Sequence, residues 1–295
     1  MKVLNYGSLN VDYTYRVPHI IVGGETMASY ELQEYCGGKG LNQSVALAKA
    51  GLDVWHAGII GNDGQMLLDA CAAAGVHTDF IRKMDVRGGH TVIQVDEKGQ
   101  NSIILYGGTN LMQTAEFADE VLSHFGEGDY LVLQNEINML DYIIDRACER
   151  GMKIVLNPSP YNENLSGCDL QKVSLFLVNE IEAAQITGNT DPEHALDALC
   201  ASFPKAAFVL TLGSDGAWYY DGEQKVFQGI FEVKAVDTTA AGDTFTGFFV
   251  SKLAEGADIQ TALRTAAKAS SIAVTRVGAV PSIPTREEVE AALEE

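Results

Sequence analysis

Basic residues are scarce in this sequence. Its 295 residues include 20 Lys and Arg against 40 Asp and Glu, which gives a formal net charge of -20 at pH 7. A surface with this charge gains nothing from counterion release on nucleic acid, and anionic membranes repel it. We therefore expect neither nucleic acid nor a membrane as a partner, and a bound phosphate group needs local positive charge.

Cysteines are few and far apart. The five form no C-x-x-C pair and no cluster with histidine, so their spacing indicates neither a disulfide framework nor a metal centre. No apolar run reaches the roughly 18 residues that a membrane span requires. The first residues also lack the charged and apolar regions of a secretory signal. These absences lead us to expect a cytoplasmic protein.

No internal repeat, low-complexity segment or linker divides the chain, and 46% of its residues are hydrophobic, which is typical of a globular domain. From residue 116 onward, helical and strand-like segments alternate, as in a parallel sheet with helices on both faces. Residues 14–35 instead predict short strands outside the main sheet, because apolar and polar positions alternate there. We expect one domain over residues 1–295, with a small β lid from about 13–36 and part of 90–107.

The strongest chemical signal is AVDTTAAGDTFTGFFV, residues 235–250. We expect a strand ending at Val236, then small residues whose backbone N–H groups are open to a ligand, then an apolar helix beginning near Asp243. A helix N-terminus with an open backbone favours a phosphate group. A carboxylate there repels the anion unless it accepts a proton from an attacking hydroxyl. The plainer alternative is that Asp243 caps the helix.

A second glycine-rich turn, CGGKGLN at residues 36–42, also leads into a helical pattern. Its spacing is that of neither a Walker A loop nor a G-x-G-x-x-G fingerprint. Lys39 and Asn42 add a cation and an amide donor where the backbone is already open. Flexibility alone is the other explanation for these glycines.

Polar residues also follow several predicted strands. Asn10 and Asp12 follow the first strand, and the segments 134–136, 157–160 and 179–180 follow later ones. Open α/β sheets bind ligands at the carboxyl ends of their strands, although turn composition explains part of the pattern. The turn at 213–216, GSDG, follows another buried strand and is suited to pass beneath a nucleotide.

The turn Gly37-Gly-Lys-Gly-Leu-Asn42 and the stretch Asp237-Thr-Thr-Ala-Ala-Gly-Asp243 resemble the two signatures of the PfkB family of carbohydrate kinases. The likeness extends over nearly the whole chain, from 7–12 to 273–282. One departure is Ala241, where the family usually has Gly. The resemblance implies a ribokinase-like three-layer α/β fold, in which a mainly parallel central sheet is flanked by helices and carries a small β-strand lid.

The same resemblance implies ATP-dependent phosphorylation of a free sugar hydroxyl, with O5 of D-ribose as the first expectation. Fructose, deoxyribose and nucleosides are alternative substrates on this scaffold. A non-catalytic sugar-binding or nucleotide-binding protein is a further alternative, but it would gain only repulsion from Asp243. A dinucleotide-dependent dehydrogenase is disfavoured, because no glycine fingerprint follows the first strand. The implied cofactors are ATP, Mg²⁺ and a K⁺-like monovalent cation, and the implied assembly is a homodimer through the lid.

Carried over from the family, the site residues fall into four groups. The catalytic group is Asp243 as base, with an anion hole of Ala240, Ala241 and Gly242. The sugar group is Asn10, Asp12, Gly38, Lys39, Asn42, Glu136 and Asp243. The ATP group is Asn179, Thr211, Leu212, Gly213, Ser214, Asp215, Gly216, Gly242 and Ala267. The group for the monovalent cation is Asp237, Thr239, Ala273, Arg276, Gly278 and Ser282.

Overall fold

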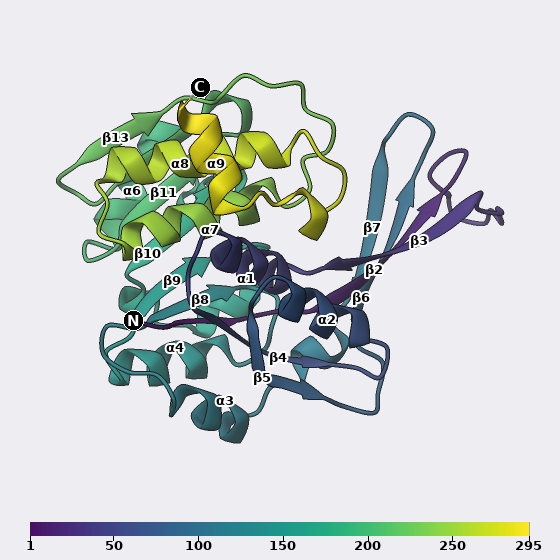
Figure 1. Cartoon of the computed structure of the whole chain (residues 1–295), viewed down its shortest axis with the longest axis horizontal. Coiled ribbons are helices and arrows are strands. Elements are labelled where there is room, and N and C mark those ends of the chain that lie inside the picture. The colour runs from purple at the N-terminus through teal and green to yellow at the C-terminus, as the bar shows by residue number, and fades with distance from the viewer. Residues whose placement is uncertain (295) are drawn as a thin grey trace.

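The computed structural model describes residues 1–294, and a nine-stranded sheet runs through the centre of the molecule (Figure 1). The strands from β11 to β5 are parallel, and β12 and β13 close one edge as an antiparallel hairpin. In spatial order the strands are β13 (Lys225–Gln228), β12 (Ala217–Tyr220), β11 (Ala207–Thr211), β10 (Leu175–Asn179), β9 (Lys153–Asn157), β8 (Tyr130–Gln134), β1 (Val3–Tyr6), β4 (Val54–Ile60) and β5 (His77–Lys83).

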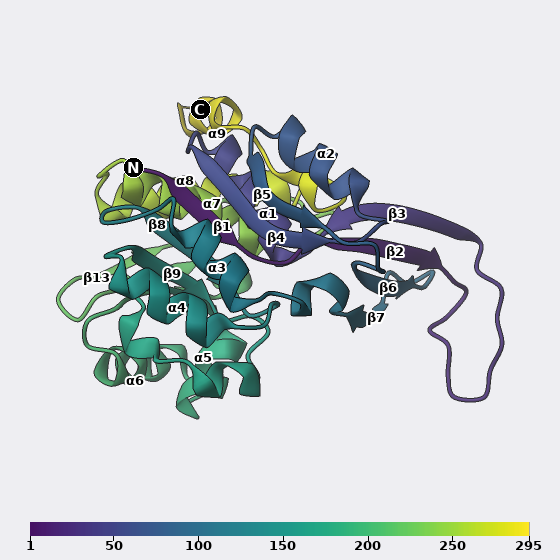
Figure 2. The ribbon, with the colours of Figure 1, turned by 90° about the horizontal axis from the view of Figure 1, so that it is seen from below.

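Helices cover both faces of this sheet, as Figure 2 shows from below. One layer contains α1 (Lys39–Lys49), α2 (Gln65–Ala73), α7 (Ala241–Ala254), α8 (Ile259–Ala273) and α9 (Arg286–Glu294). The other contains α3 (Ala115–Leu122), α4 (Leu140–Glu149), α5 (Glu180–Thr187) and α6 (Pro192–Ser202). Each layer buries its own apolar core against the sheet, because strands covered on both faces are apolar throughout. The three-layer α/β fold that the sequence predicts is thereby confirmed.

A separate four-stranded sheet, which we call the lid sheet, projects from one side of the body (Figure 1). Its strands are, in spatial order, β3 (Glu31–Gly37), β2 (Asn10–Arg16), β6 (Gly89–Val95) and β7 (Asn101–Tyr106). The central pair β2 and β6 is parallel, and each edge strand is antiparallel to its neighbour. The alternating pattern of residues 14–35 therefore belongs to strands outside the main sheet.

The segment at residues 229–240 contains no strand, so the prediction of a strand that ends at Val236 is wrong. The N–H groups of Val236 and Asp237 both donate to the carbonyl of Val274, at 2.7 and 3.2 Å. These bonds attach the segment to the C-terminal end of α8. A strand would instead have to form its backbone hydrogen bonds with the edge of a sheet. Its apolar residues consequently lie along a cavity wall.

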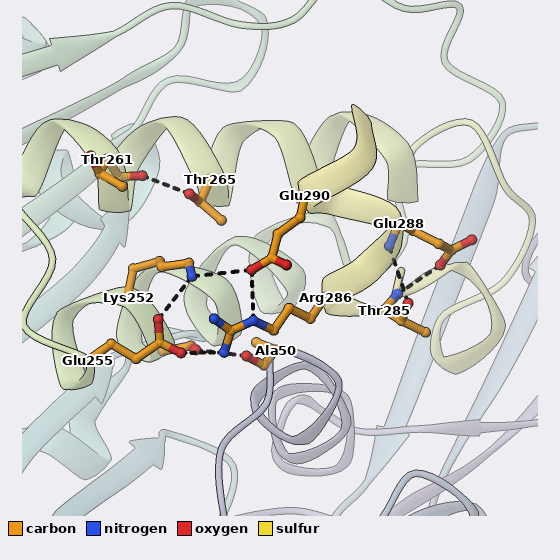
Figure 3. Close-up of polar contacts among 10 residues, drawn as sticks. Ala50, Lys252, Glu255, Thr261, Thr265, Thr285, Arg286, Glu288 and Glu290 are labelled. Carbon is orange, nitrogen blue, oxygen red and sulfur yellow. Dashed lines mark hydrogen bonds and ion pairs between the residues drawn. The ribbon is translucent and has the colours of Figure 1, made fainter. Parts of the chain in front are cut away.

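Helices α6 and α9 are absent from the sequence-based expectations, and α9 is attached both by Val289, which is buried in the core, and by ion pairs. Arg286 of α9 contacts Glu255 at 2.5 Å and Glu290 at 2.8 Å, and Lys252 of α7 contacts the same two carboxylates at 2.9 and 3.7 Å (Figure 3). A network of this kind stabilises more than isolated surface pairs do.

Within residues 1–294, none of the helices combines the length and the apolar character that crossing a bilayer demands.

Helices α1 and α7 lie side by side because Gly247 has no side chain. A Cβ atom on Gly247 would lie 2.5 Å from the Cβ of Ala46 and 2.6 Å from its carbonyl carbon. The backbones of the two helices are therefore as close as glycine allows. This contact brings the first turn of α1 next to the first turn of α7, where the motifs at 37–42 and 237–243 end.

We expect Gly247→Ala to destabilise the protein by about 1–3 kcal/mol, because the added methyl group overfills the α1–α7 contact. Helix propensity alone predicts the opposite sign, since alanine favours helices by roughly 1 kcal/mol over glycine. Urea unfolding of both proteins measures the difference. Gly126→Ala is the control, because a Cβ atom there meets nothing within 4 Å. A Gly247→Ala protein as stable as the wild type would contradict the packing argument.

Candidate active site

A cavity of about 730 Å³ lies between the lid sheet and the carboxyl ends of the main strands. It is lined by all seven residues assigned to the sugar, which come from β2, α1, α7 and the loop after β8. Lid-sheet residues that sequence reasoning did not assign form the opposite wall: Thr14, Arg16, Tyr35, Thr91, Ile93, Val95, Asn101, Ile103 and Leu105. The lid-sheet wall of the cavity therefore forms only when these strands pair, and a local sequence motif does not show which strands pair.

A second, more apolar cavity of about 390 Å³ lies on the other side of the α7 N-terminus. Six residues assigned to ATP line it: Thr211, Gly213, Ser214, Gly216, Gly242 and Ala267. Asn179, Leu212 and Asp215 do not line it. Leu212 instead braces the turn, since its N–H donates to the Gly216 carbonyl at 2.8 Å. Sequence reasoning missed Ile230, Phe231, Val233 and Val274, which line the same cavity.

The two cavities meet at the first turn of α7. Ala240 and Asp243 line the first cavity, and Ala241 and Gly242 line the second. Ala240 precedes the helix in the left-handed region, with φ 59°, a strained conformation for a residue with a side chain. Among residues 1–294, the N–H groups of Gly242 and Asp243 have no protein acceptor, whereas that of Ala241 donates to the Thr238 carbonyl. Free N–H groups at a helix N-terminus form an anion site.

Asp243 is the third residue of α7, so the alternative that it caps the helix is wrong. Its side chain is 7% exposed and receives two amide donors from α1. Asn42 Nδ2 donates to Oδ2 at 3.0 Å, and Gln43 Nε2 donates to Oδ1 at 2.9 Å. The Asn42 Oδ1 atom is buried without a partner, and Asn42 lines the sugar cavity, so this oxygen is a candidate acceptor for a sugar hydroxyl.

Lys39 is the local positive charge that an acidic chain needs at an anion site. Burial acts to lower the pKa of Lys39, but the carboxylates of Asp243, Glu136 and Glu182 outweigh it and raise that pKa. Lys39 therefore stays protonated next to the open N–H groups. Sequence reasoning missed Glu182, which is 4% exposed and forms a capping box with Asn179 at the start of α5. The Asn-x-x-Glu spacing at 179–182 was the available signal.

Two half-buried carboxylates on the sugar cavity are held as hydrogen-bond acceptors. Burial raises the pKa of Asp12 from its usual 3.8 to about 6, although the Thr91 hydroxyl, which donates at 2.6 Å, acts against the rise. Burial also raises the pKa of Glu136, against the Ser8 hydroxyl and the charge of Lys39. Glu136 further accepts the Lys39 N–H at 3.0 Å. Buried acceptors of this kind reject a substrate that lacks the matching hydroxyl.

The carboxylate of Asp237 fastens two loops together at the edge of the sugar cavity. Oδ1 accepts from the N–H and hydroxyl of Thr239, at 2.9 and 2.6 Å, and Oδ2 accepts from the N–H of Gly278 at 2.9 Å. Of the six residues assigned to a monovalent cation, these three line the cavity. The other three do not line it: the Arg276 side chain donates a hydrogen bond to Glu288, and Ala273 and Ser282 are buried.

The arrangement is therefore a carboxylate and two free N–H groups between a polar cavity and an apolar one. A model of the pfkB family of carbohydrate kinases matches residues 1–286. The chain belongs to this family. A carbohydrate kinase must bring a sugar and a nucleotide phosphate to one point, and here the two cavities meet at the first turn of α7.

Relatives of this family member share its whole length. Ribokinase from Haemophilus influenzae is 35% identical over 292 residues, which cover 96% of this chain and 95% of that protein. The structure of Arabidopsis thaliana ribokinase with ribose and ATP is 29% identical, has a TM-score of 0.85 and covers 100% of this chain and 99% of its own. Ribokinase from Cryptococcus neoformans with ADP is 31% identical, with a TM-score of 0.85 and 99% of both chains covered.

The pKa of Asp12 gives a prediction about stability. Between pH 3.8 and 6 the folded protein binds more protons at Asp12 than the unfolded chain does, so this group lowers the stability as the pH rises through that window. We expect Asp12→Asn to raise the free energy of unfolding at pH 7 by on the order of 1–3 kcal/mol relative to the wild type. Near pH 4 this difference between the two proteins should disappear.

Urea unfolding of Asp12→Asn and wild type across this pH range measures the effect. Asp141→Asn, at an exposed position on α4, is the control. A neutral-pH stability below that of the wild type would show that the ionised carboxylate is stabilising in the empty protein.

Proposed function

We propose that this protein is an ATP-dependent ribokinase that transfers the γ-phosphoryl group of ATP to the O5 hydroxyl of D-ribose. The observation that carries the proposal is the position of Asp243, which lies on the sugar cavity while the residue before it lies on the apolar cavity. The two complexes named above, one with ribose and ATP and one with ADP, support these substrates. Fructose, deoxyribose and nucleosides remain the alternative acceptors.

In this proposal each part of the site has one task. Asp12, Glu136 and the free Asn42 oxygen accept hydrogen bonds from sugar hydroxyls, and Asp243 accepts the proton of the hydroxyl that attacks. The free N–H groups of Gly242 and Asp243 and the charge of Lys39 stabilise the negative charge on the transferred group. Preorganised donors of this kind act mainly on the transition state.

Mg²⁺ enters the proposal as part of the bound nucleotide. Residues 1–294 contain no group of three His, Cys, Asp or Glu side chains that forms a metal cage. Mg²⁺ is usually held by phosphate oxygens, waters and one or two carboxylates, so the nucleotide would supply most of its ligands. Glu182, a buried carboxylate whose charge acts on Lys39, is the candidate to face the hydrated ion. The ion would neutralise phosphate charge during transfer.

Asp243→Asn tests the assignment of the base. We expect it to lower kcat about 10²- to 10⁴-fold, because an amide cannot accept the proton. Binding of ribose and ATP should change little, since the amide keeps the size and most contacts of the carboxylate. ADP release with a panel of pentoses, hexoses and nucleosides measures both kcat and the choice of acceptor. Near-full turnover by Asp243→Asn would remove the general-base role, and a preferred acceptor other than ribose would remove the substrate assignment.

The loops joined by Asp237 give a prediction about monovalent cations. We expect K⁺ to raise kcat several-fold over Na⁺ or tetramethylammonium at equal ionic strength, with a smaller effect on the KM for ribose. A cation there would orient N–H groups that act on the transition state. Constant ionic strength keeps screening fixed while the ion size changes. Equal rates in the three salts would leave Asp237 with the bracing role that its three hydrogen bonds already perform.

The lid sheet gives a prediction about assembly. Its edge strand β7 exposes apolar side chains, among them Ile104 at 63% and Tyr106 at 53%. Unpaired apolar edge strands promote association, and a two-fold axis allows one lid sheet to cover another. We therefore expect a homodimer through the lid, and a monomer for Ile104→Lys.

Sedimentation at micromolar concentration distinguishes these states. Ile181→Lys is a matched control, because Ile181 is equally exposed but lies on α5. A wild-type monomer, or equal dissociation by both variants, would contradict the lid interface.

A further inference from the structure

We propose that Gln43 is a positioning residue, which a chain of buried amides holds so that it orients the Asp243 carboxylate toward the attacking hydroxyl. This inference rests on the proposed function, in which Asp243 is the base. Gln43 is fully buried on α1 and, unlike its neighbour Asn42, does not line the sugar cavity. It therefore reaches the reaction only through Asp243.

The chain of side chains begins at Asp243 and crosses beneath α1. Gln43 Nε2 donates to Asp243 Oδ1 at 2.9 Å, and Gln43 Oε1 accepts from Gln134 Nε2 at 2.7 Å. Gln134 Nε2 also donates to Asn5 Oδ1 at 2.8 Å, and Asn5 Nδ2 donates to the Gly40 carbonyl at 2.6 Å. Gln43, Gln134 and Asn5 all have 0% exposure. The sheet strands β8 and β1 thus support the first turns of α1.

The direction of every amide in this chain is fixed from both ends. An ionised Asp243 only accepts, so the atom of Gln43 that faces it must be the donor Nε2. The other amide atom of Gln43, Oε1, then faces Gln134 and accepts a hydrogen bond. The Gln134 atom that donates it must be Nε2. At the far end the Gly40 carbonyl also only accepts, which fixes Asn5 in the matching sense. Because the two fixed ends agree, a single orientation of the three amides is compatible with these hydrogen bonds.

A histidine extends the same network at its far end. Asn5 Nδ2 also donates to Ser44 Oγ at 2.7 Å, and Ser44 Oγ is hydrogen-bonded to His56 Nδ1, likewise at 2.7 Å. His56 is completely buried, and burial lowers its pKa to about 4, so the ring is neutral. The network therefore ends on a neutral ring and places no charge of its own near Asp243.

The network is costly in stability, which argues that it has another role. Gln134 Oε1 is buried without a hydrogen-bond partner, and such an atom destabilises the folded state. Apolar side chains of similar size would fill the space between α1 and the sheet without that loss. Amides keep their protons, so the chain is no proton wire. What it supplies is a rigid donor, and an aspartate needs one because its carboxyl torsion is broad and only two-fold.

Gln43→Met tests this role, because methionine keeps the length of the side chain and removes its donor. We expect kcat to fall about 10- to 100-fold, as small misplacements of reacting groups do, while the KM values for ribose and ATP stay within about three-fold. Gln134→Met leaves Gln43 in place but removes the donor that fixes it, and should reduce kcat less. In an Asp243→Asn background, Gln43→Met should have almost no further effect.

Ser251→Ala is the control, because Ser251 makes another buried polar contact between α7 and the end of α1, to the Ala50 carbonyl at 2.9 Å. Loss of turnover in Asp243→Asn with full kcat in Gln43→Met and Gln134→Met would overturn the positioning role alone. Equal losses from Gln43→Met in the wild-type and Asp243→Asn backgrounds would overturn it too, since they indicate a general structural effect. Full turnover by Asp243→Asn would instead defeat the proposed function.

Discussion

The close contact between α1 and α7 is the constraint on which the site depends. Gly247 permits it, since any side chain there would overlap Ala46. The contact places the start of α1, with Lys39, Asn42 and Gln43, against the start of α7. Each helix contributes what the other lacks, because α1 brings the cation and the amide donors while α7 brings the carboxylate and the free N–H groups.

Electrostatics follow from that contact. The chain carries a formal charge of -20, so its overall field disfavours a nucleotide, and attraction has to be local. The charge of Lys39 and the N-terminus of α7 supply it at one point. Three carboxylates around Lys39 keep it protonated despite its burial. The same acidic surroundings that repel phosphate at a distance thus maintain the cation that attracts it.

The two motifs indicated an open turn at the start of each helix, because each motif carries its own local geometry. Gly38 adopts φ 94°, and Gly40 allows the backbone to approach Ser8 within van der Waals contact. Such positions accept only glycine, so the sequence records them directly. The wall of the apolar cavity has no comparable signal in the sequence. Phe231 and Val233 lie on an irregular segment whose apolar residues also suit a strand, and their role depends on attachment to α8.

The sequence by itself indicated the alternation of helices and strands, the two open turns and the candidate base, because periodicity and turn chemistry are local properties. Only the tertiary structure decided that Gln43, Gln134 and Asn5 form one network, since these residues lie on three elements that are distant along the chain. In the sequence, an amide side chain that will be buried cannot be distinguished from one that will be exposed. Its partners exist only after the sheet has paired and α1 has packed on it.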